Sequence, residues 1–235
     1  MTYLISWAPF LSSTIVFVFA SLVLHRYFQR HGPHLLLWSI GLFMYGIGTS
    51  CEAYYTAFGW NPLVFRLWYL FGAMLVAAWL GQGTVYLLAR RRWADIGMAL
   101  LVVGSIYGLI RVFGAELDPT QMPMGELSGR AIVTPGVRVL TPFFNLYGTV
   151  TLVGGALYSA LLFWRKRVLL HRVIGNVLIA IGAMFPALSG LFSRLGLSGY
   201  LYIGELMGAV LMFAGFLRAT ALVPETRKTS SRPVH

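Results

Sequence analysis

Seven hydrophobic stretches separated by short loops constrain this chain of 235 residues more than any other feature. A helix needs roughly 20 apolar residues to cross a hydrocarbon core about 30 Å thick, and each stretch is close to that length. Backbone groups in hydrocarbon must hydrogen-bond within their own segment, which favours helices. The sequence therefore predicts an all-α bundle of seven transmembrane helices, with spans at residues 3–24, 35–58, 63–89, 96–114, 139–164, 173–192 and 199–222.

The distribution of basic residues predicts the orientation, because Lys and Arg near helix ends are retained in the cytoplasm. Most of the 18 basic residues lie in alternate loops or in the tail. We therefore expect the N-terminus outside and the C-terminus inside, with residues 1–222 as one transmembrane domain and residues 223–235 as a short basic cytoplasmic tail. The basic residues of the expected inner face are Arg26, Arg30, Arg90, Arg91, Arg92, Arg165, Lys166, Arg167, Arg172, Arg218, Arg227, Lys228 and Arg232.

The net charge of +11 indicates contact with lipids rather than with nucleic acid, because the excess of basic residues lies in clusters next to the predicted spans. Such clusters face anionic lipid headgroups. The single cysteine, Cys51, excludes an internal disulfide and Cys-rich metal or haem motifs. We expect no cofactor. We also expect no enzymatic activity, because no catalytic set of side chains is present.

The chain also shows signs of an internal repeat. With small differences in offset, Pro9 aligns with Pro142, His34 with His171, and Gly72 with Gly208. Helices 1–3 would then match helices 5–7, with helix 4 as the linker that inverts the second unit. Parallel repeats of this kind, related by an axis along the membrane normal, occur in transporters.

Two stretches, residues 38–52 and 68–72, are similar to the second and third helices of the seven-helix membrane sensor region of bacterial histidine kinases. The order of three, one and three helices also resembles the broader group of microbial rhodopsins, SWEET and PQ-loop transporters. The resemblance implies a multi-pass protein of the cell membrane, in a bacterium the inner membrane, with a cytoplasmic or membrane signalling partner. The only lysines, Lys166 and Lys228, lie outside the spans, so covalently bound retinal is excluded, and no Pro-Gln pair occurs.

Polar residues within the spans are the best functional candidates, because they are costly in the membrane and usually face the bundle interior or a wet cavity. Glu52 and Glu205 lie near the expected outer surface, at the level of arginines at the outer ends of neighbouring helices. Further polar residues and Pro186 lie deeper. The predicted ligand-binding residues are Glu52, Tyr55, Arg66, Tyr69, Trp79, Gln82, Arg111, Asn145, Asn176, Pro186, Tyr202 and Glu205.

Each of these features also has a structural interpretation. Glu52 and Glu205 are also expected to pair with Arg66 or Arg111 and so fix the helices, as buried ion pairs do. Stripes of small residues on helices 2, 5 and 7 are typical of close helix packing. The loop between residues 115 and 138 is rich in turn residues and is expected to fold back as a lid or to remain an ordinary loop; its Met and carboxylate side chains also suggest a soft metal.

The sequence therefore predicts a non-enzymatic membrane receptor or sensor-like protein that binds an unknown small ligand in an outward-facing pocket. The alternative is a small-solute or proton-coupled transporter that works by rocking of the two repeats.

Overall fold

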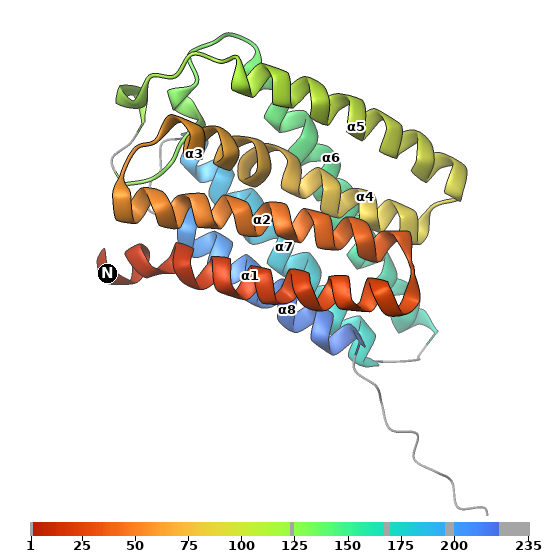
Figure 1. The fold of residues 1–235 in the computed structure, drawn as a ribbon. Helices are drawn as coiled ribbons and strands as arrows, with labels where there is room; N and C mark the ends of the chain where they lie inside the picture. Colours follow the sequence, from red (N-terminus) through yellow and green to blue (C-terminus); the bar gives the residue numbers. More distant parts are fainter. Residues whose placement is uncertain (1, 123–124, 167–169, 196–199, 221–235) are drawn as a thin grey trace, which may run out of the picture.

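The computed structural model describes residues 2–122, 125–166, 170–195 and 200–220, and side chains are described from residue 7 onward except for residues 193–195. Seven helices in this part of the chain are long and apolar enough to cross a membrane, which confirms the predicted number (Figure 1). The predictions for Arg167, for residue 199 and for the tail from residue 221 onward concern residues that the structure does not describe.

The seven spans are made of eight α-helices and one π-helical segment, and two short 3₁₀ turns lie in the longest loop. In chain order the elements are α1 (Thr2–Arg30), α2 (Pro33–Phe58), α3 (Pro62–Leu67), the π-helical η1 (Trp68–Leu75), α4 (Val76–Leu88), α5 (Arg91–Phe113), η2 (Pro119–Gln121), η3 (Gly129–Ala131), α6 (Val137–Arg165), α7 (Leu170–Leu195) and α8 (Leu201–Thr220).

Local sequence accounts for several helix ends. Pro33 and Pro62 lie in the first turns of α2 and α3, where a missing N–H costs no helical hydrogen bond. The Asn61 side chain accepts from the N–H groups of Leu63 and Val64 and so caps α3. Gly59 ends α2 with a φ of 80°, a conformation that favours glycine.

Six of the spans form a closed ring, and the fourth span, α5, lies outside it. Around the ring, α1 packs on α2, α2 on η1 and α4, α4 on α6, α6 on α7, α7 on α8, and α8 on α1. Figure 1 shows α5 along one edge of the bundle. Only about a sixth of its most apolar window is buried, 17%, so its large hydrophobic side chains face outward, as a lipid-facing helix requires.

The predicted stripes of small residues are packing seams, since glycines allow neighbouring backbones to approach closely. A Cβ on Gly48 of α2 would lie 2.6 Å from the Cα of Gly72 in η1. A Cβ on Gly148 of α6 would collide with the backbone of Ala77 in α4. The α7–α8 interface is built the same way, because a Cβ on Gly208 would lie 2.6 Å from the Pro186 ring.

The bundle has two unlike ends. We call the end with Trp7, Gly59 and residues 114–136 the loop end, and the opposite end, with Arg26, Arg90 and Arg165, the basic end (Figure 1). Helices extend further toward the basic end than the hydrophobic stretches predicted: α1 continues to Arg30. The extra turns carry polar and basic residues, which a helix accommodates at a lipid headgroup layer.

Residues 114–136, hereafter the lid, fold back over the loop end. Leu117 and Ile132 form an antiparallel bridge, and Leu127 is 1% exposed in one core cluster with Phe65 and Tyr202. The expectation that this loop covers the bundle is confirmed for its described residues. The lid buries apolar side chains of its own, so its position is fixed by packing.

Candidate functional site

Glu52 of α2 and Glu205 of α8 meet inside the bundle near the loop end. Glu52 is 0% exposed, and its Oε1 accepts a hydrogen bond of 2.8 Å from the Trp68 indole N–H. The carboxyl groups of Glu52 and Glu205 lie within hydrogen-bonding range of one another. Both Oε2 atoms are buried and accept from no N–H or O–H donor of the described residues. Glu52 is thus buried, and Glu205, which is half-buried as a residue, turns its Oε2 atom into the interior.

The predicted ion pairs with arginine are wrong. Arg66 donates from Nη2 to the Ala115 carbonyl at 2.9 Å. Arg111 donates to the Tyr107 hydroxyl at 3.0 Å and to the Pro135 carbonyl at 2.9 Å. Among the described residues the one ion pair within 4 Å is Arg91 with Asp95. Both arginines therefore attach helix ends to the lid and its flanks, while Glu52 and Glu205 have each other as partners.

The lid closes the site through Tyr202 of α8. The Leu127 N–H of the lid donates to the Tyr202 hydroxyl at 3.2 Å, and Tyr202 is 1% exposed. Glu126, beside Leu127, is also buried and interacts electrostatically with Tyr202 and Glu205. Three carboxyl groups thus gather around one tyrosine beneath a covering segment.

Tyr45 of α2 connects the two carboxyl-bearing helices a second time. Its hydroxyl donates to the backbone carbonyl of Glu205 at 2.7 Å. Tyr45 lies two turns from Glu52 on the same face of α2. The contact therefore joins α8 to α2 through a side chain next to the carboxyl pair, although α1 lies between the two helices in the ring.

The π-helical segment η1 presents the aromatic wall of the site. Trp68, which donates to Glu52, is its first residue. Tyr69 follows, and its hydroxyl lies 2.8 Å from the Thr141 hydroxyl of α6. Asn145 of α6 donates to the Ala73 carbonyl at 3.1 Å and so satisfies a backbone acceptor within the irregular segment. Single π-helical turns inside α-helices are frequent at functional sites.

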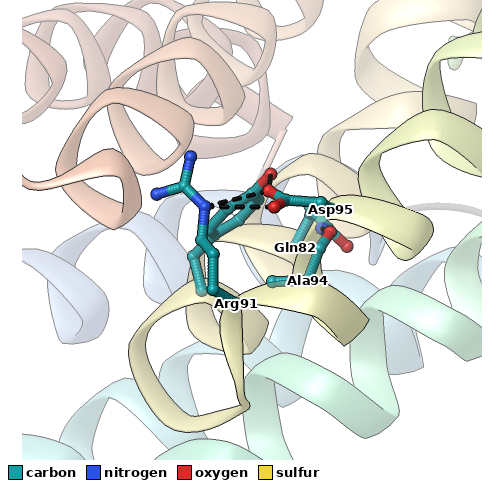
Figure 2. Close-up of polar contacts among 5 residues, drawn as sticks. Gln82, Arg91, Ala94 and Asp95 are labelled. Carbon is teal, nitrogen blue, oxygen red and sulfur yellow. Dashed lines mark hydrogen bonds and ion pairs between the residues drawn. The ribbon is translucent and has the colours of Figure 1, made fainter.

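Trp79 and Gln82 are not part of this site, because they bind α5. The Trp79 N–H donates to the Ser105 hydroxyl at 3.2 Å. Gln82 donates from Nε2 to the Ala94 carbonyl at 2.7 Å and accepts from the Tyr147 hydroxyl. Figure 2 shows Gln82 and Ala94 beside the exposed Arg91–Asp95 pair at the start of α5. These contacts attach the outer helix to the ring.

The remaining predicted residues lie apart. Tyr55 is half-buried and packs on the loop-end core. Pro186 contacts Gly208 in the α7–α8 seam. Asn176 lies toward the basic end, where it lines a cavity of about 70 Å³. Every ring helix contributes to this cavity, whose walls include Phe19 of α1, Trp38 of α2, Leu80 and Thr84 of α4, Leu152 of α6, Asn176 and Ile179 of α7, and Met212 and Phe216 of α8.

Sequence reasoning did not select Glu126 as a ligand-binding residue, nor the orphan hydroxyl of Ser12. Ser12 is fully buried, its Oγ has no partner among the described residues, and its neighbour Ser13 contacts Ser50 at 2.7 Å, two residues from Glu52. The signal that could have identified Glu126 is weak: it is a carboxylate followed by the apolar Leu127 in a turn-rich loop.

The site brings together hydrogen-bond acceptors and hydroxyl groups. In the part of the chain that the structure describes, no group of three metal-ligating side chains occurs.

No family model, curated protein or solved structure among those compared matches the chain.

Proposed function

We propose that this chain is a non-enzymatic receptor or sensor of the cell membrane, which receives a small ligand at the loop end and passes the change along the helices to a partner. The observation that carries the proposal is the buried carboxyl pair of Glu52 and Glu205 beneath a packed lid. The resemblance to membrane sensor regions of bacterial histidine kinases is in keeping with it.

The energetic cost of this site supports a functional role. A charge at the centre of a membrane helix costs about 2.5–3.5 kcal/mol by insertion scales, and an ionisable side chain nearer a helix end is still unfavourable when it is kept from water. Among the described residues, the pair has the Trp68 N–H as its donor and no basic partner. A pair of apolar residues of similar size would pack the same α2–α8 contact at lower cost. Ionisable residues that remain in such positions usually bind or relay a ligand.

The chemistry of the site favours a positively charged ligand. Glu52 and Glu205 supply acceptors, and Tyr202 joins the site to the lid through Leu127. A ligand that changes this cluster changes the lid and the α2–α8 contact together. Both helices run to the basic end, where a cytoplasmic partner would meet them if the N-terminus is outside.

The orientation is proposed from charge: the described basic residues gather at the end opposite the lid. In a Cys51→Ala background, a cysteine at exposed Val133 of the lid should react with an impermeant thiol reagent in intact cells. A cysteine introduced near Arg218 should react only after the membrane is opened. The reverse pattern would invert the topology.

Ligand reception is tested by thermal unfolding of the protein in lipid nanodiscs with small cations from Na⁺ and ammonium to choline. A ligand present at 100 times its Kd raises stability by about 2.7 kcal/mol. Glu205→Gln should lose that gain, and Glu116→Gln, at an exposed lid position, should keep it. If every cation that stabilises the wild type stabilises Glu205→Gln by the same amount, the ligand does not bind at the loop end.

A transporter is the second candidate, and the cavity at the basic end favours it. The ring closes at the loop end and keeps a cavity on its axis at the other, as expected of a carrier facing inward. The ring order also suits two three-helix repeats joined by α5. Pro186→Ala would restore a helical hydrogen bond and should reduce solute flux in proteoliposomes while leaving binding intact. If no flux is seen for the wild type, the receptor remains the better proposal.

A further inference from the structure

The contact between Glu52 and Glu205 has a chemical requirement of its own. Ionised carboxylates only accept hydrogen bonds, so two of them bond to each other only when one carries a proton. Two like charges at this distance repel, and aspartic proteases resolve the same conflict with one proton shared by two carboxyl groups. The Glu52–Glu205 contact therefore needs a proton between the two side chains.

Among the described residues, no cation lies within 4 Å of either carboxyl group. The Trp68 N–H compensates one oxygen, Oε1 of Glu52. The titratable groups that face the pair are Tyr45 and Cys51 from α2, Tyr202 from α8, and Glu126 from the lid. None of these is a cation. Arg66 is held at the Ala115 carbonyl instead.

We propose that Glu52 and Glu205 form a proton-binding site in which one proton is shared between the two carboxyl groups and keeps the lid closed. The inference rests on the proposed function, since it names the ligand of the same site. Loss of the proton leaves two carboxylates in contact. Their repulsion separates α8 from α2 and releases the Tyr202 hydroxyl from the Leu127 N–H.

The proton itself is tested by infrared difference spectroscopy of the full chain in nanodiscs. At neutral pH we expect a C=O band of a protonated carboxyl group that moves to lower frequency when glutamate is labelled with ¹³C. The band should disappear in Glu52→Gln and in Glu205→Gln and persist in Glu116→Gln. The isotope shift in the wild type assigns the band to a glutamate without any variant, and absence of the band there overturns the proposal even if the Gln variants do not fold.

A wild-type spectrum without such a band at any pH at which the protein is folded would overturn the proposal. A band that survives both Gln substitutions would also overturn it, because the proton would then lie on another group, such as Glu126.

The coupling to the lid is tested by the rate of thiol labelling of a cysteine that replaces the buried Ser128 in the Cys51→Ala background. A cysteine at the exposed Val133, labelled in the same way, corrects for the ionisation of the thiol as pH changes. As pH rises, labelling at position 128 should accelerate severalfold relative to position 133. Glu52→Gln, whose amide still donates to Glu205, should abolish the acceleration. If the infrared band follows the prediction but the labelling rate at position 128 does not change with pH, the proton site is supported and the proposed sensing function is contradicted. If cations stabilise the protein without any band, the receptor holds and the proton site fails.

Discussion

The loop end and the basic end are built by the same ring of six spans, yet only one of them is filled. At the loop end, aromatic side chains of α3, η1 and α8 and apolar side chains of the lid close the core, and Phe65 and Ala131 are completely buried. At the basic end, the same helices surround a cavity of about 70 Å³ whose walls are almost entirely apolar. The Glu52–Glu205 pair thus lies at the end of the bundle whose core is filled.

This difference indicates which end moves more easily. Closely packed interiors resist gradual deformation, so the loop end must change by repacking as a unit. The basic end can adjust by filling its own cavity. A signal that starts at the carboxyl pair therefore begins with a discrete change in the lid and ends in a region that has room to respond.

The largest expected effect comes from removing the side chain by which the lid is anchored. Leu127→Ala should destabilise the closed lid by about 2–5 kcal/mol, because a fully buried leucine loses its transfer energy and leaves a cavity. The measurement is the hydrogen-exchange protection of the lid amides. Val133→Ala, at a position 45% exposed, should leave protection nearly unchanged. Equal effects of the two substitutions would show that the lid is not held by its core.

The next effect concerns the seam between the two ends, where α4 meets α6. Gly148→Ala should destabilise the protein by about 1–3 kcal/mol, since the added methyl group collides with the backbone of Ala77. Gly154→Ala, six residues further along the same helix, has no atom within 4 Å of its added Cβ. It should be neutral or stabilise by up to about 1 kcal/mol. Thermal unfolding in nanodiscs measures both, and a tolerated Gly148→Ala would contradict this close approach.

The same Ala→Val substitution is expected to change stability in opposite directions at the two ends. Ala156→Val adds methyl groups to the cavity at the basic end and should stabilise by about 0.5–1 kcal/mol, following the cost of empty volume. Ala131→Val makes the same change in the filled loop end and should destabilise by about 1–3 kcal/mol. If both variants are destabilised alike, the basic end is as full as the loop end.

Much of the fold follows from the sequence, for a physical reason. The bilayer fixes the length of a spanning segment, so seven apolar stretches already predict seven helices. The glycines at positions 48, 148 and 208 were predicted as packing seams because helical spacing places them on one face. Their contacts with Gly72, Ala77 and Pro186 confirm it.

The partners in the site did not follow from the sequence. Charge alone favoured Arg66 and Arg111 for Glu52 and Glu205, but which side chains meet depends on how each helix is rotated in the ring. The π-helical turn at Trp68–Leu75 contributes to this difference, because an i→i+5 turn changes the face on which later residues lie. No local pattern in the sequence predicts that π-helical turn. The Trp68–Glu52 hydrogen bond therefore becomes visible only in three dimensions.

The smallest effect separates the surface of the lid from its buried carboxyl groups. Hydrogen bonds from the Thr120 hydroxyl and N–H lower the pKa of Asp118, so the Asp118 turn is stabilised by the ionised form. That stabilisation is present above the ordinary pKa of an aspartate and is lost as the pH falls through the lower folded value. Protection of the Thr120 amide should therefore fall only in acid, and Asp118→Asn should remove the pH dependence. The Glu52–Glu205 pair should respond in the opposite direction, with the lid loosening as pH rises. If acid and base loosen the Thr120 turn and the Ser128 region together, the lid behaves as one unit and the surface turn is not independent of the buried pair.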